Sequence, residues 1–264
     1  MKRRLAIAVM TGLALVARAW ADSPPAAGSV LTVESRGAGV PLYALWRDDA
    51  VATVVLFSGG GGGYGQIGAD GWPASRNFLI RSAKLFAAQP FNVVLVGLAP
   101  DVHELDGRAR LGDAHQQDNQ AIFKAIKARS KAPLWLVGTS MGTVSVTAAA
   151  IRDSGVGELA GIVLSSSVTA YKREGAVPAQ DLDKIRVPVL VLHHKQDDCG
   201  ICRPWEAKNI AAKLTAAPVS KTLIVDGGGD PSGEACGALH YHGYIGMEQQ
   251  AVDLIANWIR HPAP

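Results

Sequence analysis

Short apolar runs that alternate with helix-like stretches constrain this chain more than any other feature. The runs are rich in Val, Ile and Leu: Val51–Phe57, Val93–Leu98, Leu134–Val137, Gly161–Leu164, Val187–Leu192 and Lys221–Val225. Helical patterning marks the stretches Ser75–Ala88, Asp118–Arg129, Thr143–Arg152, Glu206–Leu214 and Met247–Ile259. Most of the runs are apolar at successive positions, which is typical of parallel strands covered on both faces. The pattern predicts an α/β fold with an open, mostly parallel twisted sheet and helices on both faces.

The rest of the chain favours a single domain. Val30–Glu34 and Leu42–Trp46 indicate a hairpin at one edge of the sheet. The 264 residues are 48% hydrophobic, which is enough for one sizeable core, and no internal repeat or long linker divides them. We therefore expect one domain over residues 22–264.

The first 21 residues have the pattern of an export signal. Lys2, Arg3 and Arg4 precede an uncharged apolar run over 5–17, and Ala19 and Ala21 supply the small residues that a signal peptidase recognises. The run would span only about 20 Å as a helix, short of a bilayer. Removal of residues 1–21, which also hold Arg18 and no acid, takes the formal net charge from +3 to −1. We therefore expect a periplasmic or secreted protein with no membrane span after cleavage and no basic surface for nucleic acid.

A nucleophile motif follows the run Leu134–Val137. The residues Gly138-Thr139-Ser140-Met141-Gly142 form G-x-S-x-G where a strand gives way to a helix. Glycines two positions either side of the serine relieve crowding in so tight a turn. The following helix directs its N-terminal amides to the place where an oxyanion would form. Ser140 is the candidate nucleophile.

With this nucleophile motif between a strand and a helix, the mature chain resembles the α/β-hydrolase family. In particular it resembles an exported esterase-like member with little or no cap. The family's order of serine, acid and histidine places the acid after the run Val187–Leu192, where Asp197 matches and Asp198 is one residue late. The histidine belongs in the loop before the last helix, where His242 matches better than His240. The resemblance thus implies a triad of Ser140, Asp197 and His242, with His240 and Asp198 as alternatives.

The glycine run over 59–63 follows the strand Val51–Phe57, where the family places one oxyanion donor. The resemblance implies that the amides of Gly60 and Met141 form the oxyanion hole, with Gly61 as the next candidate. Five aromatic side chains could line the cleft, although ordinary packing explains each of them equally well: Tyr64, Trp72, Tyr171, Trp205 and Tyr244. Only residues 165–186 are available for a cap, so an open cleft for modest-sized substrates is expected.

The cysteines allow several pairings in an oxidising compartment. On the resemblance, Cys199 lies on the acid loop and Cys236 on the histidine loop, so a Cys199–Cys236 bridge would hold the two loops together. Cys202–Cys236 and Cys199–Cys202 are the alternatives. In the favoured pairing Cys202 is left as a free thiol.

Other chemistries have weaker support. The glycine run contains G-x-G-x-x-G, but no helix follows promptly, which disfavours a dinucleotide cofactor. His193, His194, Asp197, His240 and His242 lack a recognised metal-ligand spacing, so no metal and no cofactor is expected. We expect a serine carboxylesterase that forms an acyl-enzyme with a small ester substrate. The alternatives are a serine peptidase, a thioesterase or a non-catalytic binding protein of the same fold; the sequence does not indicate an oligomeric state.

Overall fold

The computed structural model describes residues 26–153 and 155–264. The expected signal peptide, residues 1–21, lies outside the described residues. An eight-stranded sheet in the order β1-β2-β4-β3-β5-β6-β7-β8 forms the centre of the described part. The strands are β1 Ser29–Ser35, β2 Ala38–Leu45, β3 Ala52–Phe57, β4 Phe91–Val96, β5 Leu134–Thr139, β6 Gly161–Ser165, β7 Val189–His194 and β8 Ser220–Val225. β2 pairs antiparallel with both β1 and β4, whereas the strands from β3 to β8 run parallel to one another.

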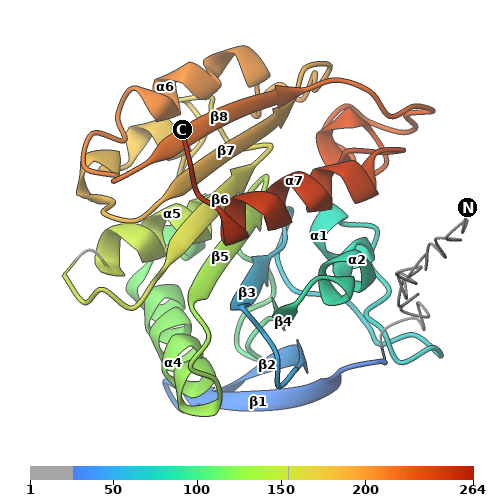
Figure 1. Ribbon diagram of the computed structural model, residues 1–264, viewed down its shortest axis with the longest axis vertical. Coiled ribbons are helices and arrows are strands. Elements are labelled where there is room, and N and C mark those ends of the chain that lie inside the picture. The colour runs from blue at the N-terminus through green and yellow to red at the C-terminus, as the bar shows by residue number, and fades with distance from the viewer. Residues whose placement is uncertain (1–25, 154) are drawn as a thin grey trace, which may run out of the picture.

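Helices cover both faces of this sheet (Figure 1). They are α1 Phe78–Arg81, α2 Ala83–Ala88, α3 Gly107–Leu111, α4 Asp113–Arg129, α5 Gly142–Asp153, α6 Ala207–Ala211 and α7 Glu248–Arg260. Four short 3-10 helices are η1 Val177–Ala179, η2 Leu182–Lys184, η3 Pro204–Glu206 and η4 Tyr241–Gly243. The fold class predicted from the sequence is confirmed.

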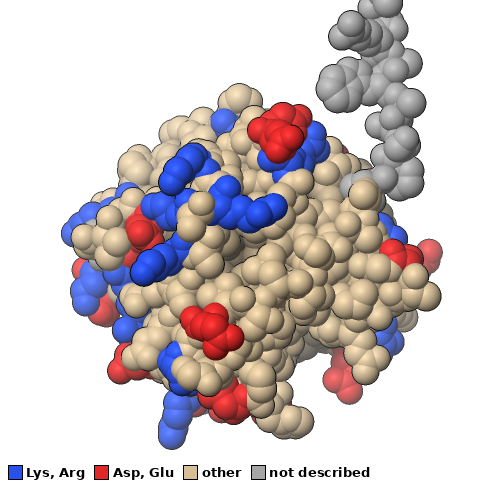
Figure 2. Space-filling model, turned by 90° about the horizontal axis from the view of Figure 1, so that it is seen from below, with Lys and Arg blue, Asp and Glu red and all other residues tan. Residues whose placement is uncertain are grey.

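The core divides into two apolar layers because successive residues of a strand face opposite sides. Val55 and Ile162 pack with α4, α5 and α6, whereas Val54 and Val163 pack with α1, α2 and α7. This two-sided burial explains why the strands read as continuous apolar runs. Charged side chains of both signs stand on the surface, with Lys and Arg grouped on part of the face seen in Figure 2.

Several predicted elements differ from the observed ones. The stretch Ser75–Ala88 holds two short helices, α1 and α2, that meet at Ser82, and α6 is shorter than the predicted Glu206–Leu214. The helix α3 was not predicted, because its five residues show no clear periodicity. In the described part of the chain, each helix is too short or too polar to span a bilayer.

The strand order places a topological switch point between β3 and β5. In the sheet β3 lies between β4 and β5. The chain first goes from β3 to β4 on one side of β3, and later returns as β5 on its other side. Ligands of open α/β sheets bind where the order reverses, at the carboxyl ends of the strands. The glycine run after β3 and the Ser140 turn after β5 both lie at this point.

The sheet offers a matched pair of isoleucines that tests this burial. Ile162 of β6 is fully buried, whereas Ile224 of β8 is 48% exposed. Ile162→Ala removes core contacts and is expected to lower the free energy of unfolding by about 2–5 kcal/mol. Ile224→Ala is expected to cost under about 1 kcal/mol. Equilibrium denaturation measures both, and equal losses would contradict the arrangement of the sheet.

Candidate active site

Ser140 lies in a strained turn between β5 and α5. Its φ of 51° is in the left-handed region, which non-glycine residues rarely adopt. The Ser140 amide donates to the carbonyl of Ser165 at 3.0 Å, and the Thr143 hydroxyl donates to the Ser140 carbonyl at 2.6 Å. These bonds fix the backbone, so the side chain of Ser140 is presented at the end of the sheet.

The two glycines of the motif are required by close backbone packing. A Cβ on Gly138 would lie 2.7 Å from the carbonyl oxygen of Gly142, and a Cβ on Gly142 would collide with the carbonyl oxygen of Phe57. Both contacts involve backbone atoms that cannot move aside without disturbing β3 or α5. The local fold of the nucleophile turn therefore explains the G-x-S-x-G pattern.

Asp197 and His242 meet across two loops. The acid follows β7 and the imidazole lies in η4, and His242 Nδ1 is 2.8 Å from Asp197 Oδ2. Both residues are buried, at 1% and 5% exposure. The amide of Cys199 donates to the other carboxylate oxygen of Asp197 at 3.0 Å. Because Nδ1 faces the carboxylate, Nε2 of His242 is the nitrogen left for chemistry.

Ser140 and His242 line the same cavity of about 260 Å³. The other lining residues are Gly59, Gly60, Asn77, Phe78, Thr139, Cys236, Ala238 and Gly243. Among the described residues Ser140 Oγ makes no hydrogen bond to His242; its polar neighbour is Cys202 Sγ at 3.8 Å. Hydrogen bonds between a nucleophile and its base are often loose before substrate binds.

The alternative pair also lies together, but in a different setting. His240 Nδ1 is 3.5 Å from Asp198 Oδ1, and the Asp198 side chain is 68% exposed. A pair at this distance and exposure gives little orientation to an imidazole. The geometry therefore favours His242 and Asp197 over His240 and Asp198.

The glycine run forms a turn beside Ser140. Gly60 has a φ of 57° and lines the cavity, and Met141 stands immediately before α5. Within the described residues the amides of Gly60 and Met141 donate to no other group. A Cβ on Gly59 would lie 2.9 Å from the Cβ of Ser140, so the loop approaches the nucleophile as only glycine allows.

A buried arginine holds this turn in place. Arg110 of α3 is 1% exposed and donates through Nη2 to the carbonyls of Gly60 and Ser58, at 3.0 and 3.3 Å. Its Nη1 donates to Ser145 Oγ at 2.8 Å, and its Nε to the carbonyl of Leu105 at 2.9 Å. Burial lowers the pKa of the Arg110 guanidinium to about 10, which leaves it charged at neutral pH.

Two residues at this site, Arg110 and Asn77, escaped the sequence analysis. Asn77 Oδ1 accepts the Leu79 amide at the start of α1, so its Nδ2 turns toward Gly59. An asparagine before an apolar run is an N-cap signal that would have placed Asn77 at a helix start. No pattern in the sequence points to Arg110.

Of the two explanations for the five aromatic residues, lining of the cleft is not observed, and packing holds for three of them. Tyr64, Trp72 and Tyr244 are core residues at no more than 8% exposure, and Tyr171 and Trp205 are more than half exposed. None of the five lines the cavity, where Phe78 is the aromatic residue.

The structure holds a Cys199–Cys236 disulfide, the pairing that the sequence analysis favoured. It joins the loop that carries Asp197 to the loop that carries His242. Cys202 is a free buried thiol, and burial raises its pKa above the usual range. Cys199, Cys202 and His242 are side chains whose donor atoms lie close enough together to hold a metal ion.

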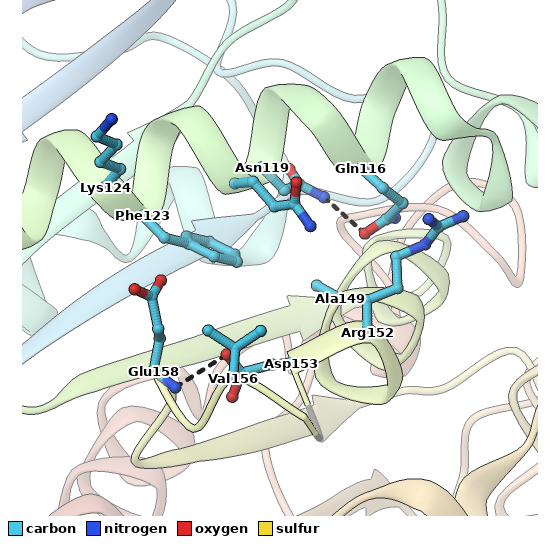
Figure 3. Close-up of a pocket in the computed structure, with 10 residues that line it drawn as sticks. Gln116, Asn119, Phe123, Lys124, Ala149, Arg152, Asp153, Val156 and Glu158 are labelled. Carbon is cyan, nitrogen blue, oxygen red and sulfur yellow. Dashed lines mark hydrogen bonds between the residues drawn. The ribbon is translucent and has the colours of Figure 1, made fainter.

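A second cavity of about 330 Å³ lies away from these residues, between α4 and the end of α5 (Figure 3). Gln116, Asn119, Arg152 and Glu158 are among its lining residues. It contains none of the candidate catalytic groups, so the cavity at Ser140 is the candidate active site.

No family model and no curated protein matches this sequence. The structure is similar to an α/β serine hydrolase homologue from Coxiella burnetii, with a TM-score of 0.62 and 14% identity over 90% of this chain and 98% of that one. It is similar to a lidless α/β serine hydrolase from Xanthomonas campestris, with a TM-score of 0.59 and 15% identity over 91% and 98%. A thermostable carboxylesterase cloned from a metagenomic library gives a TM-score of 0.60 and 20% identity over 90% and 89%. The chain therefore has the α/β-hydrolase fold.

Proposed function

We propose that this protein is a serine hydrolase that cleaves a carboxylic ester through an acyl-enzyme. The observation that carries the proposal is the 2.8 Å contact between His242 and Asp197, made beside a cavity that Ser140 also lines. Similar solved structures include a carboxylesterase and serine hydrolases, which supports the same reaction class.

The residues have distinct roles in this mechanism. Ser140 Oγ attacks the ester carbonyl while His242 Nε2 takes the hydroxyl proton. Asp197 keeps the proton of the neutral ring on Nδ1 and stabilises the imidazolium. The amides of Gly60 and Met141 donate to the oxyanion. His242 then protonates the leaving alcohol, and a water molecule, activated by the same nitrogen, hydrolyses the acyl-Ser140 ester.

The protein is proposed to act after export, in the periplasm or outside the cell. The Cys199–Cys236 disulfide supports this location, because such bonds persist in oxidising compartments. The proposed substrate is small. Between β6 and β7 the chain forms only the short helices η1 and η2, which leaves no large cap, and the cavity of about 260 Å³ has little room for a long acyl chain.

The first test uses a fluorophosphonate probe, which reacts with an activated serine. The wild-type protein is expected to be labelled and to hydrolyse p-nitrophenyl butyrate, whereas Ser140→Ala should lose labelling and at least about 10⁴-fold in kcat/KM. Ser232→Ala removes an exposed serine of the histidine loop and serves as the matched control. An unlabelled wild-type protein would instead favour a non-catalytic binding protein, and hydrolysis of an aminoacyl-anilide or a thioester faster than the ester would favour a peptidase or thioesterase.

The second test separates the two histidines. His242→Ala is expected to lower kcat by at least about 10³-fold because the general base is lost, whereas His240→Ala should change it by less than about tenfold. Asp197→Asn and Asp198→Asn form a parallel pair, in which Asp197→Asn is expected to lose more kcat than Asp198→Asn. Steady-state kinetics on one ester measures all four, and a larger loss in His240→Ala would reverse the assignment.

A third test addresses substrate size. Because the cavity is small, kcat/KM for p-nitrophenyl butyrate is expected to exceed that for the decanoate by about tenfold or more. Initial rates below the solubility limit of each ester measure the ratio. A preference for the decanoate would show that the acyl chain binds elsewhere than in this cavity.

A further inference from the structure

A group of soft metal ligands surrounds the candidate base. The Sγ atoms of Cys199 and Cys202 and a ring nitrogen of His242 all lie within 4.8 Å of one another. Cys236 is bonded to Cys199, so its sulfur adjoins the same group. Ligands bound tetrahedrally to zinc at about 2.3 Å lie roughly 3.8 Å apart. Three donor atoms are therefore near the spacing of a tetrahedral site, and Cys236 Sγ, which adjoins one of them, would have to move after reduction to complete it.

The disulfide hides this ligand set. While Cys199 and Cys236 are bonded to each other, neither is a thiolate, and Cys202 with His242 would make only a two-ligand site. Reduction would leave three cysteines and one histidine, with Cys199 and Cys202 in a C-x-x-C turn closed by the Cys202 amide donating to the Cys199 carbonyl at 3.0 Å. A Cys3His set in which two cysteines are spaced in this way is typical of structural zinc sites.

We propose that the reduced protein binds one zinc-like ion through Cys199, Cys202, Cys236 and His242. Nε2 is the ligand nitrogen of His242, because Nδ1 faces Asp197 at 2.8 Å. The Asp197 carboxylate then orients the imidazole, as carboxylates commonly do behind a histidine bound to zinc. The disulfide thus has a role besides joining two loops: it keeps the imidazole free of metal.

The reductant reaches the bond from the cavity. Cys236 is exposed and lines the cavity, whereas Cys199 is 1% exposed. A trialkylphosphine attacks Cys236 Sγ, the S–S bond breaks, and Cys199 leaves as a thiolate that takes a proton. Water then releases Cys236 as a thiol and supplies the oxygen of the phosphine oxide, so the phosphine loses two electrons and the disulfide gains them. Metal binding displaces three thiol protons to solvent.

The consequence for catalysis rests on the proposed function. Nε2 of His242 cannot accept the Ser140 proton while it is bound to a metal ion. Hydrolysis and metal binding are therefore mutually exclusive, and the redox state of one disulfide decides which is possible.

Cobalt spectroscopy tests the site without reference to activity. Full-length protein is reduced with a phosphine, desalted without oxygen and titrated with Co²⁺. One equivalent should give sulfur-to-cobalt charge-transfer bands and the visible bands of tetrahedral Co²⁺, and Zn²⁺ should bleach them. The oxidised protein should give neither. Reduced Cys202→Ser should bind Co²⁺ more weakly than the reduced wild type. Because a direct ligand is lost, the drop in affinity should exceed the roughly 10–100-fold that loss of an outer-shell partner costs.

The outcomes are decisive even if reduction loosens the fold. Reduced protein that keeps its near-ultraviolet circular dichroism and gives no charge-transfer bands would overturn the proposal, as would equal affinity in Cys202→Ser. If reduction removes that dichroism, one equivalent of Zn²⁺ should restore it, and failure to do so also counts against the site.

Fluorophosphonate labelling links the site to catalysis. Zn²⁺ should slow labelling of Ser140 at least tenfold in reduced protein, a chelator should restore it, and oxidised protein should be unaffected. If oxidised protein is never labelled, the hydrolase proposal fails while the cobalt bands still decide the metal site. If zinc binds and labelling continues at the same rate, His242 is not a ligand and the four-ligand site is wrong.

Discussion

The contact between His242 and Asp197 is the interaction on which the rest of the site depends. A carboxylate at 1% exposure is costly unless its oxygens are bonded, and here Oδ2 faces His242 while Oδ1 accepts the Cys199 amide. The two loops that meet there are joined a second time by the Cys199–Cys236 disulfide. On its other side the histidine loop is held by Arg81 of α1, which donates to the Gly243 carbonyl at 2.6 Å and pairs with Glu248 of α7 at 2.9 Å. Figure 1 shows the start of α7 and the loop before it beside α1, although they are far apart from α1 in the sequence.

The glycine loop beside Ser140 is held by a cation, Arg110, that has no carboxylate partner among the described residues. Arg110 is buried and is bonded only to carbonyls and to the Ser145 hydroxyl. Burying a cation in this way is unfavourable unless several strong acceptors replace water. The carbonyls of Ser58 and Gly60 are two such acceptors. They lie on either side of the peptide unit that carries the Gly60 amide, so the guanidinium fixes the direction of that amide.

The sequence was most informative where one local rule decided the structure. Continuous apolar runs predicted the strands to within a few residues, because burial on both faces requires them. β7 begins and ends two residues later than predicted, because His193 and His194 pair with β8. The nucleophile turn was predictable because backbone contacts within and beside the turn require glycine at 138 and 142. Arg110 and Asn77 were not, because their roles depend on where α3 and α1 pack against the glycine loop. The aromatic lining failed for the same reason: pattern alone does not say whether Tyr64 faces a core or a cleft.

The position of Ser140 follows from its backbone contacts. Its backbone is held in a left-handed conformation by bonds to Ser165 and Thr143, so the side chain is the part left free to move. Its hydroxyl lies 3.8 Å from the sulfur of Cys202, a weak partner that adds little to the barrier for rotation about the Cα–Cβ bond. Asp197 already orients the imidazole of His242, and Arg110 holds the carbonyl of Gly60. In the proposed mechanism the Ser140 side chain is therefore the part that has to turn toward His242, while the backbone around it is held in place.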